Sequence, residues 1–149
     1  MAKLRTFIDS GVLIIAARGT QELSGRAMAV FAAPQRTFIT SDFVMLEVLP
    51  KAHFYGKSRE LEFYETFFQS AQRTVRSTAA LVTLALEEAR RHGLSAVDAL
   101  HVAAAKRAKC DEFVTTENPT KAFFAVADLL VTSLRADVKT AGGLRRRGP

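Results

Sequence analysis

Apolar residues along the chain fall into short blocks that are separated by polar turns. Some blocks are rich in β-branched and aromatic residues, as buried strands are, and others repeat apolar residues three and four positions apart, as helix faces do. We predict strands over residues 4–8, 36–39, 74–76, 112–116 and 129–134. We predict helices over residues 12–17, 21–33, 43–49, 58–69, 78–92, 95–109 and 120–126. Because strands and helices alternate, the pattern predicts an α/β fold: a mainly parallel sheet of four to five strands with helices on both faces.

Polar residues mark where several of these helices begin and end. Ser41 with Asp42, Ser58 and Ser95 stand at predicted helix starts, where side-chain oxygens accept hydrogen bonds from free backbone N–H groups. Gly93 follows the helix over 78–92, and a carboxyl-terminal cap favours glycine. The buried face of that helix is expected to consist of Leu81, Val82, Ala85, Leu86 and Ala89.

The overall composition is that of an ordinary globular domain. The 149 residues are 48% hydrophobic and 24% charged, which suits one compact domain with a buried core. The single cysteine, Cys110, excludes an internal disulfide and a multi-cysteine zinc site, and we expect a packed thiol. No apolar run reaches the ~20 residues that cross a bilayer, and the amino terminus has no apolar signal core. We therefore expect a cytoplasmic protein without membrane contact.

The net charge of +6 is unevenly distributed. Residues 135–149 hold five basic side chains and one acidic one, so this segment accounts for +4 of the total. We therefore divide the chain into a folded domain over residues 1–134 and a basic carboxyl-terminal tail over residues 135–149. Such a tail can attract a polyanion or can simply keep the protein in solution.

Four carboxylates are expected to meet at one end of the sheet. Asp9 and Glu117 directly follow predicted strands. Glu47 lies in the helix after the second strand, and Asp98 lies in the first turn of the helix over 95–109. A parallel α/β sheet carries its ligand site at the carboxyl ends of the strands. Clustered carboxylates repel one another, and oxygen ligands of this kind suit Mg²⁺ or Mn²⁺, which can promote phosphodiester hydrolysis.

Each of these acids also has a purely structural interpretation. Asp98 stands three residues after Ser95, which is the capping-box position. Asp9 could turn the chain, Glu47 could face solvent, and Glu117 could belong to an ordinary turn. It is their combination that indicates a shared site.

The segments around these acids resemble the acidic motifs of PIN-domain ribonucleases. The matching segments are Phe-Ile-Asp9-Ser-Gly-Val-Leu, Glu47 after a second strand, Leu-Ser-Ala-Val-Asp98-Ala-Leu-His, and Phe-Val-Thr-Thr-Glu117. The resemblance covers about residues 4–134 and is nearest to the VapC-type toxins of prokaryotic toxin–antitoxin pairs. It implies a three-layer α/β/α fold and an endoribonuclease that depends on Mg²⁺ or Mn²⁺. It also implies an RNA substrate, a cognate antitoxin and a homodimer.

The resemblance assigns roles to individual residues. The catalytic set would be Asp9, Glu47, Asp98 and Glu117. Three of these, Asp9, Asp98 and Glu117, would bind the metal, and Glu47 would complete the acidic pocket. The last acid of the family is most often an aspartate, so the longer Glu117 departs from the pattern. Ser10 and Thr115 would support the acids by hydrogen bonds, or they are ordinary strand-end hydroxyls.

Other residues near these motifs have more than one interpretation. His101 could bond the Asp98 carboxylate or transfer a proton, and we favour the structural role. An aromatic group in the helix over 58–69 is expected to pack in the core or to line a dimer or antitoxin interface; it consists of Phe63, Tyr64, Phe67 and Phe68. Four basic residues could border the site or be ordinary surface charges: Arg18, Arg36, Lys51 and Lys57.

The sequence thus predicts a metal-dependent endoribonuclease, the toxin half of a toxin–antitoxin pair. One alternative is a catalytically silent PIN-fold module that binds RNA or protein and has lost metal affinity through its altered fourth acid. The other is a different phosphate-handling α/β enzyme, such as a receiver-like or haloacid dehalogenase-like domain. A dehalogenase-like domain would have a second aspartate where Gly11 stands, and neither of these enzymes explains Glu117.

Overall fold

The computed structural model describes residues 2–19, 22–119, 121–126 and 128–135. The strands are β1 (Leu4–Ile8), β2 (Arg36–Ser41), β3 (Arg73–Val75), β4 (Glu112–Thr115) and β5 (Leu130–Ser133). The helices are α1 (Ser10–Arg18), α2 (Glu22–Ala32), α3 (Asp42–Phe54), α4 (Ser58–Ser70), α5 (Ala79–His92) and α6 (Ala96–Arg107), with a short 3₁₀ helix, η1 (Ala122–Ala125). Every element expected from the sequence is present, and the largest difference in length is at α3.

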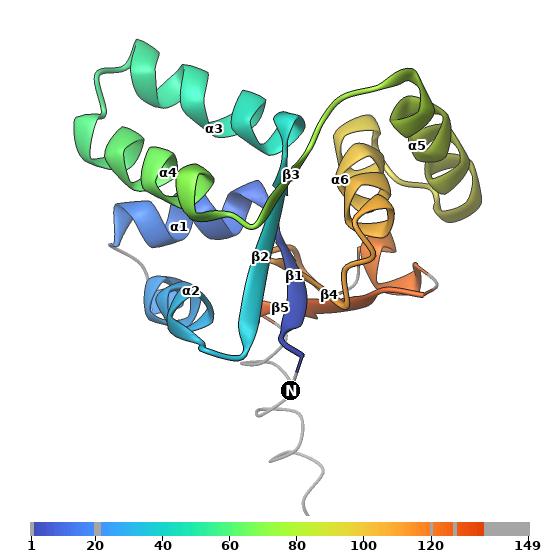
Figure 1. Cartoon of the computed structure of the whole chain (residues 1–149), viewed down its shortest axis with the longest axis horizontal. Helices are drawn as coiled ribbons and strands as arrows, with labels where there is room; N and C mark the ends of the chain where they lie inside the picture. The colour runs from blue at the N-terminus through green and yellow to red at the C-terminus, as the bar shows by residue number, and fades with distance from the viewer. Residues whose placement is uncertain (1, 20–21, 120, 127, 136–149) are drawn as a thin grey trace, which may run out of the picture.

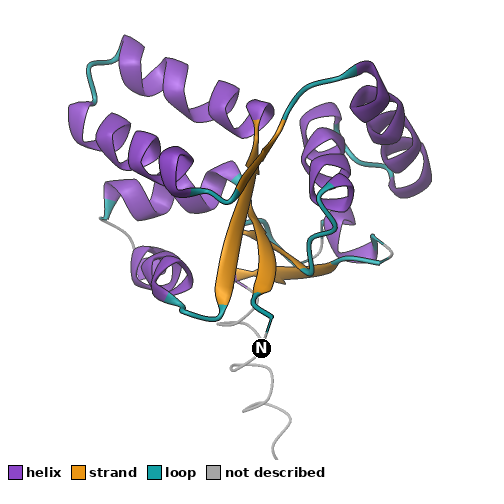
Figure 2. Cartoon of the chain, in the orientation of Figure 1, coloured by secondary structure: helices purple, strands orange, loops and turns teal. Residues whose placement is uncertain are grey.

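The five strands form one parallel sheet in the order β3-β2-β1-β4-β5. β1 lies in the middle, where Phe7 pairs with Ile39 of β2 on one side and with Phe113 of β4 on the other. Helices α1 to α4 cover one face of the sheet, and α5 and α6 cover the other (Figure 1). The three layers are plain in Figure 2, and they confirm the predicted α/β/α architecture.

The centre of the sheet is apolar because both of its faces are covered. Phe7 and Ile8 of β1 and Phe113 and Val114 of β4 have no exposed surface. The rings of Phe7 and Phe113 stack with their centroids 5.3 Å apart. Since all strands run the same way, the segments that follow β1, β2 and β4 emerge at one edge of this rigid centre.

Several helix ends follow the local chemistry that the sequence indicated. The Ser41 hydroxyl accepts a hydrogen bond from Val44 N–H at 3.2 Å and caps α3. The Ser95 hydroxyl accepts one from Asp98 N–H at 3.4 Å and caps α6. Gly93 ends α5 with φ of 69°, a left-handed conformation in which a side chain is strained.

Two expected caps are wrong. Asp42 does not cap α3; its carboxylate instead accepts hydrogen bonds from Arg76 Nη1 and from Ser77 N–H, each at 2.9 Å. Asp42 therefore ties the start of α3 to the segment after β3. Ser58 is already the first residue of α4, and Lys57 holds the N-cap position without a side-chain hydrogen bond.

Two further expectations about helices are corrected. α3 continues past Pro50 to Phe54, although proline removes a hydrogen-bond donor and usually ends a helix. Val48 and Ala52 on either side of the proline are buried, so packing outweighs the lost bond. On α5, Val82 and Leu86 are 47% and 58% exposed instead of buried. The inward face of α5 is narrower than the apolar pattern suggested, and Glu88 takes part in it.

Arg36 and Glu112 form a buried ion pair at the amino-terminal ends of β2 and β4. Arg36 donates from Nε to Glu112 Oε1 at 2.9 Å and from Nη2 to Oε2 at 3.2 Å. Thr6 and Thr132 donate to the same carboxylate. Burial raises the pKa of Glu112, but the hydrogen bonds from Arg36, Thr6 and Thr132 and the charge of Arg36 together lower the pKa overall. Arg36 thus lies at the edge of the sheet opposite the predicted site.

Cys110 is a buried thiol whose pKa burial raises to about 12, in agreement with the predicted packing role. Among the helices in the described part of the chain, none is both long and apolar enough to cross a membrane. Of the expected basic tail, Arg135 is described and donates from Nε to the Thr116 carbonyl at 2.7 Å. The rest of the tail lies outside the described residues.

Candidate functional site

Asp9 lies where β1 ends and α1 begins, at the centre of the sheet edge. It is the N-cap of α1, and its Oδ1 accepts a hydrogen bond from Ser10 N–H at 2.8 Å. Its Oδ2 accepts a bond of 2.7 Å from the hydroxyl of Thr115, the last residue of β4. Only 7% of Asp9 is exposed. The structure therefore fixes one carboxylate, by two donors, in a largely buried position.

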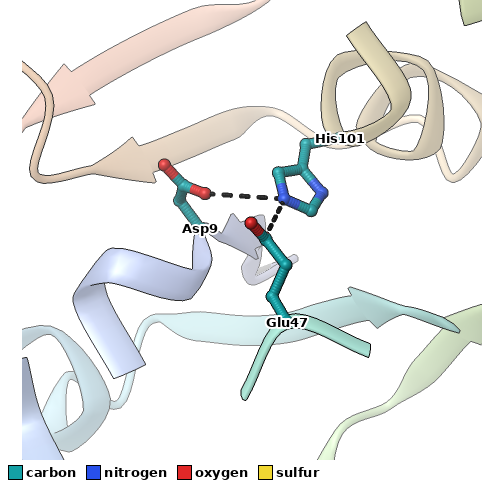
Figure 3. Close-up of side chains that lie close together, drawn as sticks. All are labelled: Asp9, Glu47 and His101. Atoms are coloured by element: carbon teal, nitrogen blue, oxygen red, sulfur yellow. Dashed lines mark hydrogen bonds and ion pairs between the residues drawn. The ribbon is translucent and has the colours of Figure 1, made fainter. Parts of the chain in front are cut away.

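Glu47 and His101 approach Asp9 from α3 and α6. His101 Nε2 lies 2.7 Å from Glu47 Oε1 and 3.8 Å from Asp9 Oδ1, so the imidazole stands between the two carboxylates (Figure 3). The His101 side chain is 1% exposed, whereas that of Glu47 is 37% exposed. Three elements that are far apart in the sequence thus place polar side chains against one another.

The electrostatics of the two acids differ. Burial raises the pKa of Asp9 above its ordinary value of 3.8, and the charge of Glu47 raises it further, against the opposing effects of His101, Thr115 and Ser10. The hydrogen bond from His101 lowers the pKa of Glu47, and the Ser10 side chain also contributes. Asp9 is consequently a buried carboxylate whose negative charge is costly, beside a second carboxylate that stays ionised.

Asp98 and Glu117 form the other side of the site. Burial raises the pKa of Asp98, and the charge of Glu117 raises it further, while Ser95, His101 and Lys121 act in the opposite direction. Glu117 donates its backbone N–H to the Thr115 hydroxyl at 3.1 Å, and its carboxylate lies 3.6 Å from Lys121 Nζ. Asp98 is therefore close enough to Glu117 and His101 for both residues to affect its pKa.

One hydroxyl links the two sides of the site. Thr115 is fully buried, and its Oγ1 donates to Asp9 Oδ2 while accepting from the Glu117 N–H. Ser10, beside Asp9, acts on Glu47 through its side chain. The Thr115 hydroxyl and the Ser10 backbone N–H thus donate to the two oxygens of Asp9.

The donor atoms are of a kind that holds a divalent cation. One oxygen each of Asp9 and Glu47 and a ring nitrogen of His101 lie within 4.8 Å of one another, and no other such group of three occurs among the described residues. Carboxylate oxygens are the ligands that Mg²⁺ and Mn²⁺ prefer. The raised pKa of buried Asp9 also fits a cation, because a positive ion there would relieve the cost of its charge. Asp98 and Glu117 lie outside this tight group.

A comparison with protein families decides what kind of domain carries this site. The profile of the PIN domain matches residues 6–123. The chain belongs to the PIN domain family. No curated protein sequence matches the chain.

Several solved structures that resemble this PIN domain are toxins or toxin–antitoxin complexes. VapBC2 of Rickettsia felis, bound to a promoter DNA fragment, is 14% identical with a TM-score of 0.66; the match covers 87% of this chain and 98% of that one. VapC20 of Mycobacterium tuberculosis, described as a sarcin–ricin loop cleaving toxin, is 20% identical with a TM-score of 0.61 over 72% and 86% of the two chains. DNA-bound VapBC of Salmonella typhimurium is 17% identical with a TM-score of 0.59 over 90% and 99%. At sequence identities this low, the structural similarity establishes the fold alone.

A cleft next to Glu47 collects basic side chains of the PIN domain. It has a volume of about 130 Å³, and Arg18, Lys51 and Lys57 line it together with Glu47 and Glu60; Arg18 Nε lies 3.5 Å from Glu60 Oε2. Tyr55, which is 66% exposed, also lies on its wall. Three of the four basic residues that the sequence suggested therefore border the acidic group. The fourth, Arg36, is committed to Glu112 at the opposite edge.

The partner of His101 differs from the one expected. The sequence suggested Asp98, one helical turn away, but the hydrogen bond goes to Glu47, 54 positions away in the chain. Nothing in the local sequence indicates this pairing, because it depends on how α3 and α6 are rotated about their axes. Of the aromatic group on α4, Tyr64 and Phe67 are buried and Phe63 and Phe68 are partly buried, so core packing accounts for most of it.

Proposed function

We propose that this PIN domain is a divalent-metal-dependent endoribonuclease and the toxin of a type II toxin–antitoxin pair. The family match and the toxin–antitoxin structures support the general class. The observation that carries the proposal is the buried Asp9 carboxylate, which faces Glu47 at the carboxyl ends of the central strands. Such a pair is stable when a cation neutralises it, and Mg²⁺ or Mn²⁺ has the right ligand preference.

We propose the roles of the acids from the resemblance to PIN-domain ribonucleases, since Asp98 and Glu117 lie outside the tight group of Asp9, Glu47 and His101. Asp9, Asp98 and Glu117 would hold the ion, and Glu47 would complete the catalytic set. The bound cation would polarise the phosphodiester and lower the pKa of the attacking water. Thr115 and Ser10 orient the acids by hydrogen bonds, and the surrounding core keeps Asp9 away from bulk water.

RNA would reach the acids along the basic cleft. An acidic centre repels phosphate, so nearby cations are needed to hold the backbone of the substrate. Lys51 and Lys57 meet this need because they line the cleft together with Glu47, whereas Arg18 in the same cleft already pairs with Glu60. The exposed ring of Tyr55 offers a flat apolar face against which a base can stack.

A protein partner would cover the exposed apolar residues of α3. Leu46, Phe54 and the adjoining Tyr55 are 68%, 79% and 66% exposed, which is unusual for side chains of this size. Related structures are complexes with antitoxins, so an antitoxin is the partner that we propose for this surface, with a second copy of the chain as the competing occupant.

The proposal is tested with Asp9→Asn and Asp98→Asn, which keep shape but remove charge. Both variants should lose RNA cleavage by about 100-fold or more in Mg²⁺ or Mn²⁺, because the ion loses a ligand. Asp111→Asn is the matched control, since Asp111 is exposed before β4 and bonds Arg5 N–H at the opposite edge of the sheet. Cleavage is followed on gels with circular dichroism to verify folding.

Full cleavage by a folded Asp98→Asn protein would remove Asp98 from the mechanism. Calorimetry with Mn²⁺ separates the enzyme from a silent binding module. Heat of binding by the wild-type protein, lost in Asp9→Asn, supports the nuclease. A silent titration of the wild-type protein at millimolar metal refutes it.

A further inference from the structure

His101 lies in the middle of α6, and its two ring nitrogens have different surroundings. Nε2 faces both acids, 2.7 Å from Glu47 Oε1 and 3.8 Å from Asp9 Oδ1. Nδ1 points away from both carboxylates (Figure 3). It is buried and has no hydrogen-bond partner among the described residues. This asymmetry distinguishes what each nitrogen does.

The short distance to Glu47 places a hydrogen on Nε2. A carboxylate oxygen only accepts, so a contact of 2.7 Å is a hydrogen bond when Nε2 donates. With its hydrogen on Nε2, a neutral imidazole leaves only a lone pair at buried Nδ1. A hydrogen on Nδ1 would instead be a buried donor without an acceptor, which is costly.

His101 is also poorly placed to act as a metal ligand. Coordination through Nε2 would move the hydrogen to Nδ1, where metal-binding histidines normally have a hydrogen-bond acceptor. No acceptor for Nδ1 occurs in the described part of the chain. The nitrogen that faces the acids is therefore suited to donate a hydrogen bond and poorly suited to bind the ion.

We infer that His101 is a positioning residue whose Nε2–H holds the Glu47 carboxylate beside Asp9, so that both acids face the ion; this inference rests on the proposed function. Glu47 needs such a donor because its side chain is 37% exposed and carries the same charge as nearby Asp9. Without the N–H group, repulsion would turn Glu47 towards water. With it, one carboxylate oxygen is fixed and the other stays available to the site.

Two amide substitutions distinguish the two nitrogens. The amide nitrogen of glutamine in His101→Gln reaches about as far as Nε2, whereas that of asparagine in His101→Asn reaches about as far as Nδ1. The Mn²⁺ affinity of the full chain is measured by calorimetry for these variants and for His101→Leu. We expect His101→Gln to stay within about threefold of the wild type and the other two to weaken about tenfold or more, because Glu47 then no longer holds its negative charge beside the ion.

His92→Leu is the matched control. His92 is another largely buried histidine beside a carboxylate, 3.5 Å from Glu88 on α5 and outside the acidic site. Its replacement should leave Mn²⁺ affinity unchanged. Circular dichroism verifies that each variant is folded, and the ¹⁴N coupling in the electron spin resonance of bound Mn²⁺ reports direct coordination by imidazole; we expect none.

The possible results have separate meanings. Unchanged or tighter Mn²⁺ binding by folded His101→Leu overturns the positioning role. Equal losses in the glutamine and asparagine variants overturn the assignment to Nε2–H. A ¹⁴N coupling that disappears in His101→Gln makes His101 a ligand and also overturns the inference. A wild-type protein that binds no Mn²⁺ refutes the proposed function itself.

Discussion

The hydroxyl of Thr115 offers a quantitative test of how the site is built. In Thr115→Val the shape is nearly kept, but two hydrogen bonds are lost: the bond donated to Asp9 Oδ2 at 2.7 Å and the bond accepted from Glu117 N–H at 3.1 Å. A bond to a charged group contributes about 1.5–3 kcal/mol, and a neutral one contributes about 0.5–1.5 kcal/mol. We therefore expect the free energy of unfolding to fall by about 2–4 kcal/mol.

Thr40→Val is the matched control for this measurement. Thr40 lies on β2, is fully buried like Thr115, and its hydroxyl has no hydrogen-bond partner in the described part of the structure. Its replacement by valine should be neutral or stabilising, because no bond is lost and a buried polar atom is removed. The difference between the two variants isolates the contribution of the hydroxyl bridge.

The assay is urea denaturation of the metal-free proteins at neutral pH. The Thr115 bond lowers the pKa of Asp9, so it stabilises the ionised carboxylate. The difference in unfolding free energy between the wild type and Thr115→Val should accordingly become smaller as the pH falls and Asp9 takes up a proton. If Thr115→Val and Thr40→Val unfold within about 0.5 kcal/mol of each other at neutral pH, the bridge contributes nothing and the reasoning fails.

Two further predictions concern charge. Arg36→Met leaves Glu112 as a buried charge without its ion-pair partner and should reduce the free energy of unfolding by about 3–5 kcal/mol. The folded variant should cleave RNA like the wild type. Unchanged stability in urea would contradict the first expectation, and a loss of cleavage would contradict the second. Because burial raises the pKa of Asp9 and Asp98 in the folded state, the metal-free protein should lose stability as the pH rises from their ordinary pKa of 3.8 through the raised values. Melting temperatures measured in EDTA as a function of pH test this, and the melting temperature of Asp9→Asn should depend less on pH than that of the wild type. If both depend on pH equally, the buried charge of Asp9 does not cause the loss of stability.

Much of the fold follows from local sequence, and the exceptions have physical causes. The strands around Phe7 and Phe113 are predictable because each holds a pair of strand-forming apolar residues, Phe7-Ile8 and Phe113-Val114, as a sheet covered on both faces favours. The capping roles of Ser41 and Ser95 are predictable because they depend on neighbouring N–H groups alone. The continuation of α3 past Pro50 is not, since packing by distant residues decides it.

The site was predictable in outline but not in its pairings. Parallel strands bring their carboxyl ends to one edge, so Asp9 and the segment after β4 are expected to meet. Which side chains then touch depends on the rotation of each helix. The contact between His101 and Glu47 therefore needed the structure, as did the separation of Arg36 from the basic cleft.

The place of β4 next to β1 matters while the protein is being made. β1 and Asp9 leave the ribosome early, but Thr115, the neighbour that encloses Asp9, follows 106 positions later. A nascent chain that ends before β4 already carries Asp9, Glu47 and Asp98, yet Asp9 in it is open to water and lacks its Thr115 donor. The group of side chains around Asp9 is therefore complete only once the chain has been made as far as Thr115.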